Sequence, residues 1–130
     1  MRIREYFKTR ELICRCGCGL MPNDNSIERL YALRILYGKP MIINSAGRCV
    51  DHNRAVGGST GSIHLPAKHR VGASSGWGGA AFDIRVSSRI ETAVIEALAL
   101  KCGFTGFGYG NGFIHIDDAK RPEEMRWLYS

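Results

Sequence analysis

The segment Ala81-Phe-Asp-Ile-Arg-Val86 decides the fold, because its residues alternate between large apolar side chains and small or charged ones. Successive side chains of a strand point to opposite faces of a sheet, so Phe82 and Ile84 are expected in the core. The opposite face then carries Asp83. The segment therefore predicts a strand with a core on one side and an acid on the other.

A second segment, Phe113-Ile-His-Ile-Asp117, has the same alternation. Ile114 and Ile116 point to one face, while Phe113, His115 and Asp117 point to the other. The two strands thus each present a side chain able to bind a metal on the face away from the core. A shorter, strongly apolar strand is expected at residues 40–45.

Two helices are expected, the first from about Ser26 to Tyr37. Asn25 is the predicted N-cap, with Glu28 at the third position. Gly38 and a following proline end this helix.

The second helix is expected from about Arg89 to Lys101, where Ser88 and Glu91 form a capping box. Its packed side is predicted to carry three apolar residues, Ile90, Val94 and Leu98.

The order of elements is helix, strand, loop, strand, helix, strand, strand. We therefore expect an α+β fold, in which a small antiparallel sheet has helices on one face and a zinc cleft on the other. The chain has 130 residues with 45% apolar content and shows no linker or repeat, which predicts one domain over residues 1–130.

The composition narrows the class of partner. Lysine and arginine exceed the acids by 6 charges, a balance suited to an anionic partner such as nucleic acid or a wall polymer. No apolar stretch is long enough for a membrane helix, and the basic start from Arg2 to Arg10 has no apolar run behind it. We expect a protein made in the cytoplasm without a signal peptide, with no membrane span.

A zinc site can be built from the residues above. A catalytic zinc takes three protein ligands of the histidine and carboxylate kind and keeps a fourth position open. Of the 4 histidines, His64 and His115 together with Asp83 would supply that set. Spacing alone leaves the alternative that each histidine is an ordinary surface or core residue.

Several motifs follow one another in a specific order. They are Ser45-Ala-Gly-Arg48-Cys49, His52-Asn53, Val56-Gly57-Gly58, Ser62-Ile-His64, Gly79-Ala-Ala81-Phe-Asp83-Ile84 and His115-Ile-Asp117. In this order the chain resembles the zinc D-alanyl-D-alanine carboxypeptidases and endopeptidases, the hedgehog-related peptidoglycan metallopeptidases. The resemblance covers nearly the whole chain and is greatest to small single-domain members from phages and bacteria.

The resemblance implies that His64, Asp83 and His115 bind Zn²⁺. It also implies that Arg48 holds a carbonyl or carboxylate oxygen of the substrate, where a fixed cation stabilises growing charge; a loop-bracing arginine is the alternative. Ser62 would contact substrate or orient His64, unless it is simply a turn residue. The implied reaction is amide hydrolysis, in which zinc polarises the carbonyl and activates water.

The stretch between His64 and Asp83 is longer than in the family. The additional residues, roughly Leu65 to Gly78, are polar and glycine-rich, which indicates a surface loop. Because the loop starts at a predicted ligand, we expect it to overhang the cleft and contact substrate. His69, within it, is a predicted substrate contact and a rival ligand to His64.

The general base is a second departure from the family. Many relatives have an acid three residues before the last zinc histidine, where this chain has Gly112. Asp117 shares a strand face with His115, roughly 6 to 7 Å along the chain, and is predicted as the catalytic base. The alternative is that Asp117 accepts the free ring proton of a ligating histidine. His52 and His69 are further candidates.

The cysteines offer a second cluster. Cys14, Cys16 and Cys18 lack the two-residue gaps of ordinary zinc knuckles, but Cys49 or Cys102 could complete four sulfurs. The alternative is a set of buried or exposed free thiols.

The C-terminal tail carries Trp127 and Tyr129. Packing of these rings onto the body of the domain is favoured over stacking on sugar rings.

The predicted function is zinc-dependent hydrolysis of peptidoglycan peptides by a phage endolysin or virion-associated lysin that acts on the cell wall. The partner is the peptide substrate, and we expect a monomer that does not bind nucleic acid, since no aromatic and basic platform accompanies the charge. The alternative is a non-catalytic zinc-binding domain of the same fold that binds the wall or builds the virion.

Overall fold

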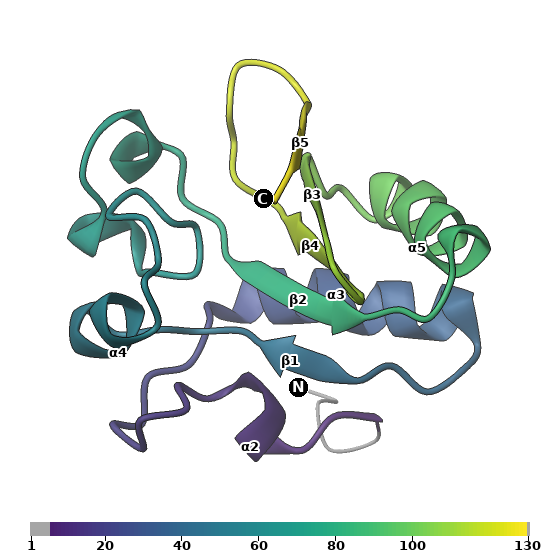
Figure 1. The fold of residues 1–130 in the computed structure, drawn as a ribbon, viewed down its shortest axis with the longest axis horizontal. Helices are drawn as coiled ribbons and strands as arrows, with labels where there is room; N and C mark the ends of the chain where they lie inside the picture. Colours follow the sequence, from purple (N-terminus) through teal and green to yellow (C-terminus); the bar gives the residue numbers. More distant parts are fainter. Residues whose placement is uncertain (1–5, 130) are drawn as a thin grey trace.

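The computed structural model describes residues 6–129. Residues 1–5 and 130, which belong to the predicted single domain, lie outside this part. Its centre is a five-stranded sheet in the order β1-β2-β4-β3-β5 (Figure 1). The strands are β1 (Ile43–Ser45), β2 (Ala81–Arg85), β3 (Gly106–Gly110), β4 (Phe113–Asp117) and β5 (Met125–Leu128). The α+β class is confirmed.

One pair of strands departs from the antiparallel sheet that the sequence predicts. β1, β2, β4 and β3 are joined by antiparallel pairs, whereas β5 pairs with β3 in parallel. The chain runs from β4 through a loop and returns as β5. The sequence does not predict a strand at these residues. The strand expected over residues 40–45 is also shorter, since β1 covers only Ile43–Ser45.

The register between β2 and β4 places the predicted site residues side by side. Asp83 is opposite His115, and Ala81 is opposite Asp117. Since residues two apart on a strand share a face, these side chains lie on one side of the sheet. Phe82 and Ile84 lie on the other side, fully buried in the core.

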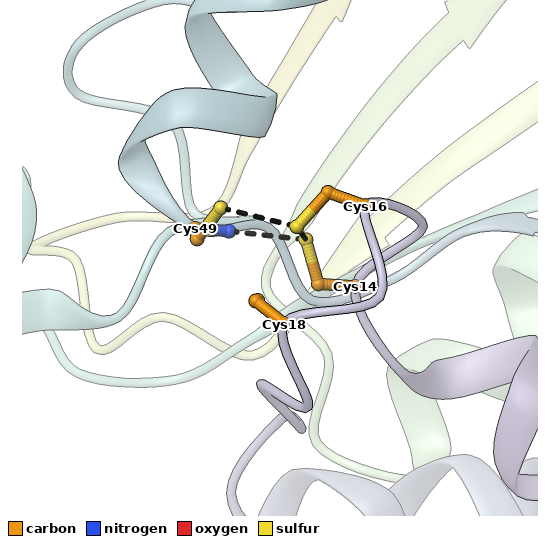
Figure 2. Close-up of side chains that lie close together, drawn as sticks. All are labelled: Cys14, Cys16, Cys18 and Cys49. Atoms are coloured by element: carbon orange, nitrogen blue, oxygen red, sulfur yellow. Dashed lines mark hydrogen bonds between the residues drawn. The ribbon is translucent and has the colours of Figure 1, made fainter.

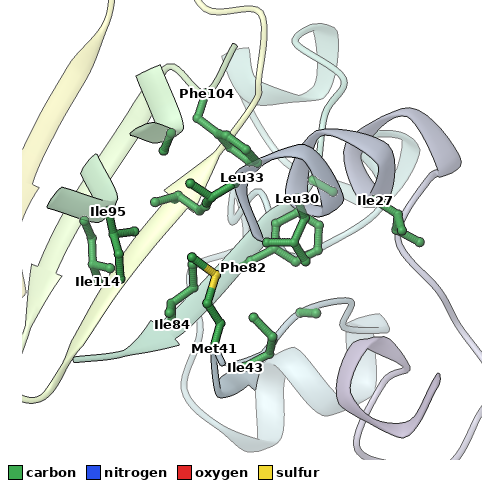
Figure 3. Close-up of a cluster of buried hydrophobic side chains, with 14 of the residues drawn as sticks. Ile27, Leu30, Leu33, Met41, Ile43, Phe82, Ile84, Ile95, Phe104 and Ile114 are labelled. Carbon is green, nitrogen blue, oxygen red and sulfur yellow. The ribbon is translucent and has the colours of Figure 1, made fainter. Parts of the chain in front are cut away.

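The core lies between the sheet and two helices, α3 (Asp24–Tyr37) and α5 (Arg89–Lys101). Figure 3 shows Leu30 and Leu33 of α3 and Ile95 of α5 directed toward the apolar face of β2 and β4. The helices therefore cover one face of the sheet and leave the other to the predicted site.

The first helix begins earlier than the sequence predicts. Asn23, and not Asn25, is the N-cap, and its side-chain oxygen accepts a 2.9 Å hydrogen bond from the amide of Ser26. Both residues can cap a helix, and the chain uses the one that allows an extra half-turn. Gly38 ends the helix in the left-handed conformation (φ 72°), as expected.

The second helix has the predicted bounds, but the side of the helix that is buried differs from the predicted one. Ser88 caps it by accepting a hydrogen bond from the amide of Glu91. Ile90 is 79% exposed and Val94 is also exposed, so the predicted packed side is wrong for both. The buried stripe is Ile95 and Ala99, with Leu98 partly buried beside it, because this side of the helix faces α3 and β4.

The insertion at residues 65–78 is more ordered than the surface loop that its composition indicates. It contains two short 3₁₀ helices, η1 (Ala67–His69) and η2 (Ala73–Gly76). Between them, the buried Arg70 guanidinium donates five hydrogen bonds of 2.6–3.2 Å to backbone carbonyls. The acceptors are Ile63, Leu65, Ser74, Gly78 and Gly79. All five donors of one side chain thus hold the insertion together.

The sequence does not predict two further short helices, α2 (Thr9–Leu12), which precedes α3, and α4 (Val50–Ala55), which follows β1. Within residues 6–129, no helix combines the length and the apolar character needed to cross a membrane.

Candidate metal centre

Three predicted ligands meet on the face of the sheet away from the helices. Asp83 lies on β2, His115 on the adjacent β4, and His64 on the loop that precedes the insertion. One ligand atom from each lies within 4.8 Å of the others. Oδ1 of Asp83 is 3.2 Å from Nε2 of His64 and 3.1 Å from Nδ1 of His115. The fold therefore brings together the set that the sequence predicts.

The backbone sets the tautomer of His64. Its Nδ1 lies 2.6 Å from the carbonyl oxygen of Ala46, a group that can only accept a hydrogen bond. Nδ1 is accordingly protonated, and Nε2 is the ring nitrogen that faces Asp83. A histidine held in this way is prepared to bind a metal through Nε2.

The second histidine is oriented by Asp117. Nε2 of His115 donates to Oδ2 of Asp117 at 2.8 Å, which leaves Nδ1 facing Asp83. Asp117 is itself held by two hydrogen bonds from Arg121, at 2.6 and 3.1 Å, and one from the amide of Ala119. The two histidines thus place different ring nitrogens against the same carboxylate, Nε2 of His64 and Nδ1 of His115.

The electrostatics match a metal site. Burial lowers the pKa of His64, despite the neighbouring Asp83. Burial would raise the pKa of Asp83, but its close contacts with His64 and His115 outweigh burial and hold that pKa well below its usual range. His64 is therefore neutral and Asp83 ionised near pH 7, the forms in which each binds a metal.

His115 is in the opposite situation. Burial would lower its pKa, but hydrogen bonds to Asp117 and Asp83 outweigh burial and raise it. The raised pKa favours the protonated form of His115, so a metal ion would compete with a proton for this ring.

A pocket of about 480 Å³ opens above the three ligands. Its walls include Trp77 from the insertion and Trp127 and Tyr129 from the C-terminal segment. The ring of Trp127 lies 5.0 Å from that of His115, between centroids. The tail therefore packs on the body of the domain, as predicted, and in doing so forms one side of the pocket.

Arg48 and Ser62 both line this pocket. Nη2 of Arg48 lies 3.7 Å from Oδ2 of Asp83. The same guanidinium donates to Oγ of Ser45 and to Oδ1 of Asn53, both at 3.2 Å, which fixes its position. Oγ of Ser62 accepts a 3.2 Å hydrogen bond from the amide of His64.

His69 does not reach the pocket. It is exposed at the end of η1 and belongs neither to the pocket lining nor to the metal-competent group around Asp83. The adjacent Arg70 turns inward to bind the backbone carbonyls, so His69 points to solvent. The insertion contributes Trp77 to the pocket, a residue whose role the sequence did not single out.

Asp117 faces away from the pocket. It is fully buried, does not line the cavity, and its oxygens are already bonded to His115, Arg121 and the amide of Ala119. This placement does not suit a general base and fits the alternative, in which Asp117 orients a ligating histidine. Arg121 neutralises the charge of Asp117. Nothing in the sequence predicts this role, apart from the position of Arg121 four residues after Asp117.

The donor set fits a single zinc ion. Two neutral-nitrogen donors and one carboxylate at the foot of an open pocket are the ligands of a hydrolytic zinc site, with room for water and substrate. The site therefore has the donor set of a metal-dependent hydrolase.

Comparison with known families specifies the class further. The model of the family described as Peptidase M15 matches residues 5–117, and the chain belongs to this family. The family is zinc-dependent, which makes the chain a metallopeptidase with His64, Asp83 and His115 as its candidate metal-binding groups. Searches of curated proteins and of solved structures found no match.

Proposed function

We propose that this protein hydrolyses amide bonds in peptidoglycan peptides, with one zinc ion held by Nε2 of His64, a carboxylate oxygen of Asp83 and Nδ1 of His115. The observation that carries the proposal is the pair of histidine ring nitrogens that meet one carboxylate at the foot of a pocket. Zinc bound there would polarise the scissile carbonyl and lower the pKa of the attacking water.

The residues around the ligands prepare the site. The carbonyl of Ala46 and the carboxylate of Asp117 each hold one histidine ring in its binding tautomer. We assign Asp117 this orienting role in place of the base. His115 and Arg121 keep Asp117 ionised, since their hydrogen bonds and charges outweigh burial and lower the pKa of the carboxyl.

Arg48 is proposed to bind the substrate oxygen on which charge develops. Its guanidinium is anchored by Ser45 and Asn53 and stands at the edge of the pocket beside Asp83. An anchored cation needs little reorganisation during the reaction, which is what makes such a group effective. Ser62 lines the same wall and supports the backbone of His64.

The pocket walls suit a peptide stem more than a sugar chain. Trp77 and Tyr129 offer apolar surface, while Arg48 supplies the positive charge that a peptide carboxylate would meet. The net charge of +6 favours association with polyanionic walls. We propose a phage endolysin or virion-associated lysin as the setting.

A specific observation supports a second candidate. Within residues 6–129, Asp83 is the only carboxylate that lines the pocket, and it is committed as a ligand. A domain without a base could retain zinc and bind the wall, or serve in a virion, without cutting. Purified peptidoglycan incubated with the protein separates the two. Hydrolysis predicts new amino termini by mass spectrometry that a chelator abolishes, whereas a binding domain sediments with the wall and releases nothing.

The control for this experiment is His115→Ala, which removes a ligand from β4. Release of the same peptides by wild type and by His115→Ala would contradict the proposed site.

A further inference from the structure

Four cysteines from two distant segments converge outside the peptidase site. Cys14, Cys16 and Cys18 lie on the turn after α2, and Cys49 directly precedes α4 (Figure 2). Their sulfur atoms all lie within 4.8 Å of one another. The sequence also allows Cys102 as the fourth cysteine, but Cys102 does not belong to this group.

The sulfur spacing is that of a tetrahedral metal site. Sγ of Cys16 lies 3.5 Å from that of Cys14 and 3.6 Å from that of Cys49. Four thiolates at about 2.3 Å from a zinc ion place neighbouring sulfurs about 3.8 Å apart. The described cysteines are all free thiols, so no disulfide accounts for the cluster.

The backbone is shaped to bring three closely spaced cysteines to one point. Gly17 and Gly19 have φ angles of 85° and 89°, a region that favours glycine. These two residues let the chain turn after Cys16 and again after Cys18. The turn is closed by a 2.8 Å hydrogen bond from the amide of Cys14 to the carbonyl of Leu20.

Backbone amides also point at the sulfurs. The amide of Cys49 donates to Sγ of Cys14 at 3.4 Å, and the amide of His52 donates to Sγ of Cys49 at 3.3 Å. Such hydrogen bonds stabilise the thiolate form, which is the form that binds a metal.

We propose that Cys14, Cys16, Cys18 and Cys49 bind a second zinc ion in a closed, structural site. Binding displaces the proton of each thiol and leaves no open position for water or substrate. The ion joins the N-terminal turn to the segment that carries Arg48.

The segment that carries Arg48 and Cys49 also borders the pocket, so a metal ion held by Cys49 would act on the backbone of the peptidase site. Cys49 follows Arg48, whose amide donates a 2.9 Å hydrogen bond to the carbonyl of His64. The amide of Gly47 bonds the carbonyl of Leu12, before the cysteine turn. The structural zinc would therefore fix the loop on which Arg48 is anchored, without being part of the peptidase site.

Metal analysis of purified protein tests the proposal independently of hydrolysis. Wild type is expected to hold two zinc ions per chain. The Cys16→Ser, Cys18→Ser double variant should hold one, since both side chains are exposed and their replacement disturbs no core packing. Cys102→Ser, the matched control, should retain two.

A measurement on the unmodified protein avoids dependence on folding of the variants. An organomercurial that titrates thiolates should release one zinc ion per chain from wild type, while His115→Ala, which lacks the other zinc, should release its remaining ion completely. If the mercurial releases no zinc from wild type, or the four cysteines prove to be disulfide-linked in the purified protein, the proposal is overturned. Retention of both ions by His115→Ala would instead contradict the peptidase ligand set.

Discussion

Nε2 of His115 donates a 2.8 Å hydrogen bond to Asp117, and this contact decides which nitrogen of the ring faces the metal-binding position. The pair lies on one strand, two residues apart, so the backbone of β4 sets the distance between ligand and orienting carboxylate. Arg121 then holds Asp117 in place from the far side.

Replacement of Asp117 by asparagine should weaken the zinc ion that depends on His115 by about ten- to a hundredfold, because the ring loses its anionic partner. Zinc competition with a chromophoric chelator measures this. Asp51→Asn, a change at an exposed acid, is the control and should have no effect. Unchanged zinc affinity with turnover reduced by about 10² to 10⁴ would restore Asp117 to the role of general base.

Arg48→Ala should lower kcat/KM by on the order of a hundredfold through loss of a cation at the developing charge. Arg54→Ala, at an exposed arginine of α4, should cut at the wild-type rate. Because Arg48 also bonds Ser45 and Asn53, the Tm of each variant is measured alongside. An Arg48→Ala protein that melts earlier but, while folded, hydrolyses normally would reduce Arg48 to a bracing residue.

Arg70→Met should destabilise the fold by about 3 kcal/mol, since five backbone carbonyls lose their donors at once. Urea unfolding compares it with Arg54→Met, which removes an exposed guanidinium. Equal unfolding midpoints for the two variants would show that the insertion does not depend on Arg70.

Trp77→Ala tests whether the insertion contacts substrate. Loss of one wall of the pocket should raise KM by roughly tenfold, about 1.4 kcal/mol, with little change in kcat. Val71→Ala, a change at an exposed residue of the same insertion, is the control. Identical KM values for the two variants would place substrate elsewhere in the pocket.

The strands that carry Asp83 and His115 could be predicted from the sequence, because apolar and polar residues alternate along any strand whose sheet buries one face. β5 could not be predicted in the same way. Met125 and Leu128 are exposed, so the strand has no buried stripe, and its existence depends on pairing with β3.

Some residues have roles that depend on backbone atoms distant in the chain, and the sequence alone does not predict those roles. Arg70 is indistinguishable from a surface arginine until the carbonyls around it are in place. The choice of Cys49 over Cys102 likewise depends on how α4 begins, and the part played by Asp117 depends on Arg121.

The rates at which three proteins hydrolyse a peptidoglycan stem peptide test whether zinc at the proposed site performs the reaction. The proteins are the metal-free form, the same protein reconstituted with zinc, and His115→Ala. We predict no hydrolysis without metal, recovery on addition of zinc, and no recovery in His115→Ala although it remains folded. Hydrolysis by the metal-free protein at the full rate would contradict zinc-dependent catalysis. Absence of hydrolysis by folded wild type with zinc bound at His64, Asp83 and His115 would contradict the proposed peptidase activity.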